Sequence, residues 1–273
     1  MNRLEKIAIS VRHTPGLDNA EWLWRRVRPA YDRMLRRLGS HKGLERTING
    51  VDRIRLSPLS RGFVDENYEP QVWNRVMREV RPGDRIAEVG AHIGLYSLAF
   101  ARRAAAGGHV VAFEPEPDNA QTLEANIAVN GWQDRITVVR AAVGDRCASV
   151  RFAANFGCES HVLRGDEASQ SALEVPMVTL DSYFPDAKID LLKIDVEGFE
   201  ELVLRGGLSL LADKRRRPRL ILIEVHPFAW EAVGTSSDSL LGRLRECGYG
   251  VETVAGIAVT RIVDYGHVVA IPG

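Results

Sequence analysis

The chain has 273 residues, a length that suits one large domain or one domain with an appendage. Its hydrophobic content of 45% is ample for a buried core, and 26% charged residues is ordinary for a globular protein. The 36 lysines and arginines balance the 36 aspartates and glutamates, so a net charge of +0 gives no general attraction to nucleic acid.

The cysteines and the hydropathy pattern exclude several classes of protein. Cys147, Cys158 and Cys247 are far apart and lack C-x-x-C spacing, which indicates reduced thiols rather than a disulfide framework or a zinc site. No apolar run reaches the length of a membrane span, and the polar N-terminus has no signal-peptide core. We therefore expect a cytoplasmic protein without a membrane span or a nucleic-acid partner.

Residues 1–80 are predicted to form an N-terminal appendage made of a helix and a β-hairpin. Apolar residues recur at three- and four-residue intervals along an amphipathic stripe interrupted by Pro29. The arginines around this stripe are interpreted as a solvated helix face rather than a surface for an anionic partner. Trp22 and Trp24 would pack the helix on the main domain or across a homodimer, so a lid and a dimer interface both stay open.

Two further elements are predicted before residue 81. Asn49-Gly50 lies between two β-prone runs, over residues 44–48 and 51–56, and this dipeptide is a strong hairpin signal. Tyr68-Glu69-Pro70 then leads into a helix whose apolar residues continue to Val80.

From residue 82 onward, strands and helices alternate, which predicts a parallel sheet with helices on both faces over residues 81–273. The first unit is a strand that passes through a glycine turn at residues 90–94 into a helix. Gly90 and Gly94 let the backbone turn sharply and approach a ligand closely. The helix N-terminus offers unpaired N–H groups to a polar ligand.

The turn does not match the phosphate-binding motifs. A dinucleotide fingerprint needs a middle glycine where this chain has Ala91 and His92, and the Gly-Lys-Ser/Thr ending of a Walker loop is absent. Glu88 favours an ammonium group, and Glu114 at the end of the next strand is placed to accept hydrogen bonds from ribose hydroxyls. An amino-acid moiety beside a ribose indicates S-adenosylmethionine (SAM) rather than NAD. The predicted cofactor-binding residues are Glu88, Gly90, Ala91, His92, Gly94, Glu114, Asn119, Asp145 and Asp195.

The next elements surround the predicted nucleoside. A helix is expected to start at Pro117 and to end at Asn130-Gly131, followed by a third strand over residues 135–139. The end of that strand would pass over an adenine, so Asp145 or the adjacent backbone is a candidate adenine contact; a simple turn is the alternative.

Residues 146–178 interrupt the alternation and are predicted to be an insertion above the ligand-binding end of the sheet. Short strands are expected over residues 148–154, 161–164 and 174–178. The insertion would either wall the acceptor pocket or be loop decoration. Its candidate wall residues are Asn155, Glu159, Ser160 and His161.

Two neighbouring strands are each predicted to end in polar residues. The fourth strand closes with Lys193 and Asp195, and a lysine in an apolar central strand is costly unless it is paired or functional. Period-two alternation places Lys193, Asp195 and Glu197 on one face if the strand continues that far. The fifth strand closes with Glu224 and His226. A site role is favoured over a purely structural ion pair because these groups converge at one rim.

The C-terminal region is predicted to hold a helix over residues 236–247 and two strands, 250–254 and 259–271, joined by little more than a turn. A β-hairpin at the end of a doubly wound sheet is typical of Rossmann-like SAM methyltransferases. The predicted fold is therefore α/β, with a mostly parallel sheet, an antiparallel last strand, helices on both faces and the N-terminal appendage.

Between about Tyr68 and His226 the chain resembles FkbM-type SAM-dependent methyltransferases. The family usually has Asp at the position of Glu88 and Asn at that of His92, and glutamate keeps the charge. The matching segments are Tyr68-Glu-Pro70, Gly83-Asp84, Glu88-Val-Gly-Ala-His-Ile-Gly94, Phe113-Glu-Pro115, Ala142-Val-Gly-Asp145, Thr179-Leu-Asp181, Asp190-Leu-Leu-Lys-Ile-Asp-Val-Glu-Gly-Phe-Glu200 and Leu222-Ile-Glu-Val-His226.

The resemblance implies methyl transfer to an oxygen, commonly a hydroxyl of a small molecule such as a sugar or a glycosylated secondary metabolite. In our hypothesis Asp195 or His226 is the general base, Glu224 orients the substrate or the histidine, and Lys193 completes the catalytic set. A second version has Asp195 and Glu224 holding Mg²⁺. The alternatives are an NAD-linked oxidoreductase of nucleotide-sugar type and a non-catalytic binding subunit with a SAM fold.

Overall fold

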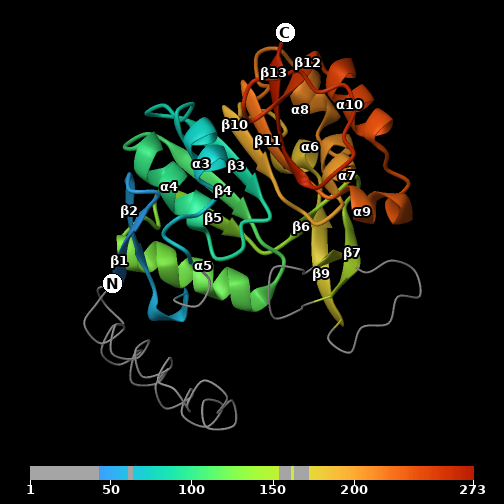
Figure 1. Cartoon of the computed structure of the whole chain (residues 1–273). Helices are drawn as coiled ribbons and strands as arrows, with labels where there is room; N and C mark the ends of the chain where they lie inside the picture. Colours follow the sequence, from blue (N-terminus) through green and yellow to red (C-terminus); the bar gives the residue numbers. More distant parts are fainter. Residues whose placement is uncertain (1–42, 61–63, 154–160, 163–171) are drawn as a thin grey trace, which may run out of the picture.

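The computed structural model describes residues 43–60, 64–153, 161–162 and 172–273 (Figure 1). The predicted N-terminal helix with Trp22 and Trp24 lies outside the described residues. So do Asn155, Glu159 and Ser160 of the predicted pocket wall, together with the side chain of His161. In the described part of the chain, no helix is long and apolar enough to cross a membrane.

A seven-stranded sheet with the order β12-β13-β11-β10-β3-β4-β5 forms the centre of the fold (Figure 1). All its strands are parallel except β13, which runs antiparallel to β11 and β12 and confirms the predicted antiparallel last strand. The strands are β3 (Arg85–Val89), β4 (His109–Phe113), β5 (Ile136–Val139), β10 (Leu191–Ile194), β11 (Leu220–Val225), β12 (Tyr249–Thr253) and β13 (Gly266–Pro272).

Helices cover both faces of this sheet, so its central strands are apolar on both sides. Along β11, Ile221 and Ile223 belong to the core cluster under α7 and α10, whereas Leu222 belongs to the cluster under α3 and α4. The helices are α3 (Pro70–Met77), α4 (Leu95–Ala104), α5 (Pro117–Asn130), α6 (Leu180–Tyr183), α7 (Glu200–Arg205), α8 (Leu208–Ala212), α9 (Pro227–Trp230) and α10 (Ser237–Glu246), with the 3-10 turns η1 (Pro58–Ser60) and η2 (Glu231–Val233).

The predicted hairpin is confirmed as β1 (Leu44–Ile48) and β2 (Asp52–Leu56). Asn49 and Gly50 both have positive φ, 49° and 72°, as the tight turn that joins twisted strands requires. The hairpin packs against α4 and α5, and Ile48 and Ile54 share one core cluster with the central sheet. The described part of the predicted appendage therefore has no core of its own, and the boundary near residue 80 stays a prediction.

The predicted insertion is a small second sheet with the order β6-β9-β7-β8. It begins directly after β5 and returns to the central sheet through α6, so it leaves the central sheet between its third and fourth strands in chain order. Its strands are β6 (Ala142–Val143), β7 (Ala148–Ala153), β8 (His161–Val162) and β9 (Ala172–Val178).

The prediction of a tight C-terminal hairpin is wrong in its connection. Residues 254–265 join β12 to β13, and a single bridge between Glu252 and Ala258 folds the start of this segment back on β12. The longer connection ends with Tyr265, which it brings to the cavity described below.

Asn126 of α5 ties the hairpin segment to the glycine turn after β3. Its Oδ1 accepts hydrogen bonds from the Ser57 N–H (2.7 Å) and the Ser60 hydroxyl (2.8 Å), and its Nδ2 donates to the Ile93 carbonyl at 2.7 Å. The side chain is fully buried. Because a buried amide satisfies these groups, the position of the turn depends on a contact with the N-terminal segment.

We expect Asn126→Ala to lower the free energy of unfolding by about 2–4 kcal/mol, because buried donors and acceptors lose their partner. Chemical denaturation followed by circular dichroism measures the change. Asn130→Ala is the matched control: Asn130 bonds the backbone of Arg55 near the surface, so its loss should cost less than about 1 kcal/mol. Equal losses in the two variants would contradict the interpretation.

Candidate functional site

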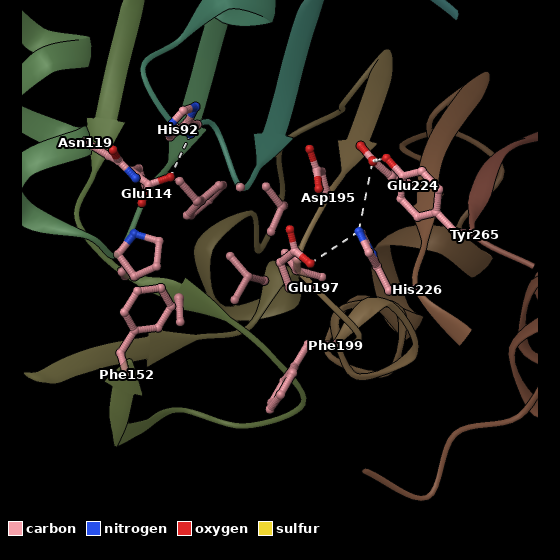
Figure 2. A pocket seen from close by; sticks show the side chains of 18 of the residues that line it. His92, Glu114, Asn119, Phe152, Asp195, Glu197, Phe199, Glu224, His226 and Tyr265 are labelled. Atoms are coloured by element: carbon pink, nitrogen blue, oxygen red, sulfur yellow. Dashed lines mark hydrogen bonds and ion pairs between the residues drawn. The ribbon is translucent and has the colours of Figure 1, made fainter. Parts of the chain in front are cut away.

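A cavity of about 410 Å³ lies at the carboxyl ends of the central strands (Figure 2). Gly90, Glu114, Asp195 and Glu224, which follow or end β3, β4, β10 and β11, all line it. Its volume is typical of small-molecule pockets, and its position is where open α/β sheets bind ligands.

The glycine turn shapes one wall of this cavity. Gly90 has φ +81°, and a Cβ added there would lie 1.7 Å from the Asp195 carbonyl oxygen, so only glycine lets the ends of β3 and β10 meet. Gly94 precedes α4, and a Cβ there would lie 2.0 Å from Leu123 Cδ1. Gly90 and His92 line the cavity. Ala91 and Gly94 are buried behind them, where they help to set the conformation of the turn.

Glu114 is held rigidly beside this turn. Its Oε2 accepts a hydrogen bond from the His92 N–H at 2.7 Å, and its Oε1 accepts one from the Glu116 N–H at 2.9 Å. Burial raises the pKa of Glu114 to about 7, against the opposing effect of these backbone donors. Glu114 and Asn119 both line the cavity, so a carboxylate with free lone pairs and an amide can bind neighbouring hydroxyls.

Two predicted cofactor residues lie elsewhere. Glu88 is 1% exposed, because the alternation along β3 turns its side chain beneath α4, where it accepts a hydrogen bond from the Ser97 hydroxyl. Burial raises its pKa to about 7. Asp145 forms ion pairs with Arg146 and Arg205 and does not line the cavity. Neither side chain lines the cavity, so direct contact of Glu88 and Asp145 with a cofactor stays a prediction; near Asp145 the cavity is lined by Ala141, Ala142 and Val143.

Lys193 is a buried counter-ion rather than a cavity residue. It is 4% exposed, its Nζ lies 3.0 Å from Asp195 Oδ2 and 4.0 Å from Glu88 Oε1, and it stacks over the Tyr96 ring. The ion pair that the sequence analysis held as the structural alternative is present, and Lys193 does not line the cavity, whereas Asp195 does. A catalytic role of Lys193 stays a prediction. Burial raises the pKa of Asp195, and the Lys193 charge opposes that rise.

His226 forms a dyad with Glu200, a residue that the sequence did not single out. Its Nδ1 lies 2.7 Å from Glu200 Oε1, and the same carboxylate, 0% exposed, accepts hydrogen bonds from the Trp230 Nε1–H (2.7 Å) and the Gly198 N–H (2.9 Å). Because a carboxylate only accepts, His226 carries its hydrogen on Nδ1.

The other ring nitrogen of His226 faces the cavity (Figure 2). Nε2 lies 3.4 Å from Glu197 Oε2 and 4.0 Å from Glu224 Oε1. Burial would lower the pKa of His226, but the hydrogen bond and the charge of Glu200, with the charges of Glu197 and Asp195, raise it. The arrangement is that of a general base whose tautomer is set by a buried carboxylate.

Glu224 lies on the same rim and stays ionised. The Tyr265 hydroxyl donates a hydrogen bond to its Oε1, and His267 lies 3.3 Å from its Oε2. Burial would raise the pKa of Glu224, but these contacts and the Lys193 charge lower it to about 2. Tyr265 comes from the long connection before β13, which explains why the sequence pattern did not place it here.

Backbone strain gathers at the cavity. Glu69, His92 and Glu197 line it and have φ values of 41°, 50° and 49°, in the left-handed region that residues with a Cβ rarely adopt. Such conformations persist where surrounding structure imposes them, and they are typical of functional sites. β10 ends at Ile194, before Asp195 and Glu197, so the condition under which these two residues would share one face of the strand with Lys193 is not met.

Two groups of side chains in the described residues bring three metal-ligating atoms together. One is Asp195, Glu197 and His226, and the other is Glu69, Glu224 and His267. Asp195 and Glu224 fall in different groups, and the Mg²⁺ site predicted for these two residues stays a prediction. In both groups a histidine replaces one of the expected oxygen ligands.

The fold is that of the Rossmann-like methyltransferases. Its sheet has seven strands in the corresponding order, with one antiparallel strand, and a cavity lies over the carboxyl ends of the parallel strands. Residues 88–251 match the family described as the methyltransferase FkbM domain. The chain belongs to this family.

Three relatives have similar sequences. The AMB antimetabolite synthetase AmbE of Pseudomonas aeruginosa is 29% identical over 227 residues, and the methyltransferase sdnD of Sordaria araneosa is 29% identical over 154 residues. The catechol O-methyltransferase of Bos taurus is 28% identical over 144 residues. The matches cover 69%, 44% and 52% of this chain but only 10%, 59% and 45% of the relatives.

We expect cofactor binding to depend on the protonation of Glu114. Its raised pKa means that it is protonated below about pH 7 in the free protein, whereas two hydroxyl donors require the carboxylate. The affinity for S-adenosylhomocysteine should therefore be constant above about pH 8 and fall up to tenfold per unit below about pH 7. Calorimetric titration across this range measures the dependence.

Glu114→Gln is the control for this prediction. The amide cannot titrate, so the variant should bind more weakly at high pH and lose most of the pH dependence. An unchanged pH dependence in the variant would assign the effect to another carboxyl group, such as that of Glu88 or Glu197, whose pKa values are also about 7.

Proposed function

We propose that this protein is an O-methyltransferase that acts on a hydroxyl of a small molecule, of the sugar or glycosylated-metabolite class. The observation that carries the proposal is the Glu200–His226 dyad, which directs Nε2 of the His226 ring toward the cavity at the ends of β10 and β11. An alcohol must lose a proton when it attacks a methyl group, and a positioned imidazole accepts that proton.

The cofactor end of the cavity fits SAM. Glu114 and Asn119 are placed to hold the ribose diol, and Ala142 with its neighbours offers an apolar surface for the adenine. Asp195 and the carbonyl ends near Gly90 can hold the ammonium group. When bound there, SAM supplies a methyl group activated by its sulfonium. The protein contributes mainly alignment of the acceptor oxygen with that methyl group.

The acceptor end supplies the base and its support. His226 Nε2 takes the hydroxyl proton, and Glu200 stabilises the imidazolium that forms, through the 2.7 Å hydrogen bond to Nδ1–H. Glu197, 3.4 Å from Nε2, adds to that stabilisation. Lys193 holds Asp195 in place at 3.0 Å without entering the cavity.

The charge of the cavity supports a neutral, hydroxyl-rich acceptor. The described residues that line it include five carboxylates and no lysine or arginine. A pyrophosphate would find no cationic side chain there, which disfavours the NAD-linked alternative. Carboxylates accept hydrogen bonds from sugar hydroxyls, and Phe199, Phe228 and Tyr265 offer aromatic surfaces to a ring. Phe228 is 76% exposed in the free protein.

A binding subunit without catalytic activity would have no use for the Glu200–His226 dyad. Glu200 is buried and its carboxylate is used by three donors, of which the His226 ring is one. The bovine relative is named as an O-methyltransferase, which is compatible with transfer to oxygen here.

The proposal is tested in two stages. Calorimetry should show stoichiometric binding of SAM and S-adenosylhomocysteine to the full chain. Purified protein with methyl-labelled SAM is then screened against monosaccharides and glycosylated metabolites. Acceptor-dependent S-adenosylhomocysteine formation with a methyl ether as the product supports the proposal. Failure to bind either nucleoside, or a product methylated on nitrogen or carbon, would overturn it.

We expect His226→Gln to reduce the acceptor-dependent rate by about 10²–10⁴-fold while S-adenosylhomocysteine binding is retained. Glu200→Gln should reduce the rate by at least about tenfold, because an amide no longer stabilises the imidazolium. Steady-state kinetics with the acceptor found above measures both effects. His109→Gln is the control, because His109 begins β4 at the opposite end of the sheet. Full activity in His226→Gln would remove this residue as the base.

A further inference from the structure

A second side-chain cluster lies beside the base, on the α3–α4 side of the sheet. Glu69 precedes α3, Glu224 is the last residue but one of β11, and His267 is the second residue of β13. The antiparallel register pairs Glu224 directly with His267, and the N-terminal end of α3 brings Glu69 above them. One ligand atom of each residue lies within 4.8 Å of the others.

His267 has the properties of a metal ligand. Its side chain is 10% exposed, and its buried Nε2 makes no hydrogen bond. Nε2 lies 3.3 Å from Glu224 Oε2 and 3.6 Å from Glu69 Oε2. These separations exceed the usual N–H···O distance of about 2.7–3.2 Å. They are close to the ligand–ligand edge of about 3.3 Å in a tetrahedral site with bonds of about 2.0–2.1 Å.

Both carboxylates are oriented by tyrosines, as the ligands of metal sites usually are. The Tyr96 hydroxyl donates to Glu69 Oε2 at 2.9 Å, and the Tyr265 hydroxyl donates to Glu224 Oε1. Glu69 also keeps its left-handed backbone, φ 41°, at this position. The two tyrosines therefore fix the carboxylates of Glu69 and Glu224, and the Nε2 of His267, which makes no hydrogen bond, lies between these carboxylates.

We propose that Glu69, Glu224 and His267 form a binding site for one divalent transition-metal ion of the Zn²⁺ class. One imidazole and two carboxylates suit this class of ion better than Mg²⁺, which prefers oxygen ligands alone. Glu69 and Glu224 line the cavity, so the remaining coordination position faces the acceptor end.

A role in catalysis follows from the position and rests on the proposed function. Glu224 Oε1 lies 4.0 Å from His226 Nε2, so the ion site and the base flank the same part of the cavity. An ion there binds an acceptor oxygen and orients the hydroxyl toward the base. The binding site itself stands on the cluster geometry alone.

The other candidate cluster, Asp195, Glu197 and His226, lacks the corresponding signal. In the described structure Asp195 Oδ2 lies 3.0 Å from Lys193 Nζ, and His226 Nδ1 lies 2.7 Å from Glu200 Oε1. It provides the matched control, because it has the same ligand types at the same end of the cavity.

The test is calorimetric titration of ZnCl₂ into metal-free full-length protein without SAM. We expect one ion per chain. His267→Gln and Glu69→Gln should each weaken Zn²⁺ binding by about 10²-fold or more, because each removes a residue that binds the ion directly. Tyr265→Phe should weaken binding by about tenfold. Glu197→Gln should leave the affinity unchanged. Substitution with Co²⁺ should give the visible absorption of a tetrahedral ion, lost in His267→Gln.

Two results would overturn the proposal. One is the absence of stoichiometric Zn²⁺ binding, and the other is binding that Glu197→Gln removes and His267→Gln retains. Thermal melting of each variant establishes that it is folded, and Glu69→Gln, at the cavity surface, serves if His267→Gln does not fold. Because SAM is absent, Zn²⁺ binding without S-adenosylhomocysteine binding refutes the proposed function alone, and the reverse result refutes the metal site alone.

Discussion

The buried ammonium group of Lys193 is the interaction on which the rest of the site depends. It lies in the middle of the sheet, and the parallel register pairs it with Glu88 on β3. Moving this charge out of water is costly, and Asp195 at 3.0 Å and Glu88 at 4.0 Å offset the cost. Removing the ammonium would leave two buried carboxylates without a counter-charge. The ion pair with Lys193 therefore holds Asp195, directly after β10, in the position where it lines the cavity.

The sheet separates two chemical environments at this rim. Beneath α7 and α9, the buried Glu200 accepts from the His226 ring and sets its tautomer. On the side of α3 and α4, Tyr96 and Tyr265 orient two carboxylates around His267. The end of β11 contributes a side chain to each environment, because Glu224 and His226 are two residues apart. A base and a cation site therefore flank one cavity without sharing a ligand.

Packing constraints explain how the chain tolerates so many charges in one place. Gly90 permits the closest approach of two strand ends, and Glu69, His92 and Glu197 adopt left-handed backbone that the surrounding contacts impose. The hairpin contributes through Asn126, whose buried amide connects it to the turn after β3. The N-terminal segment thus supports the cofactor end of the cavity as well as the core.

The sequence by itself determined the features that depend on local chemistry. Asn49-Gly50 specified a hairpin turn, and the strand–glycine–helix unit specified the turn that forms one wall of the cavity. Glu114 lines this cavity because strand ends in a parallel sheet meet at one edge, and its contact with a cofactor stays a prediction. The alternation of elements was sufficient for the fold class, and the two β-prone runs near the C-terminus were sufficient for the antiparallel last strand.

Only the tertiary structure decided which faces and distant partners these residues have. Glu88 turned beneath α4 because the pleat of β3 is set by its neighbours, and Asp145 paired with Arg205 outside the cavity. Glu200, Tyr265 and His267 became site residues through α7, a long connection and strand register, none of which has a local sequence signal. Contacts between residues far apart in the chain depend on packing, and a single sequence does not encode them in any short pattern.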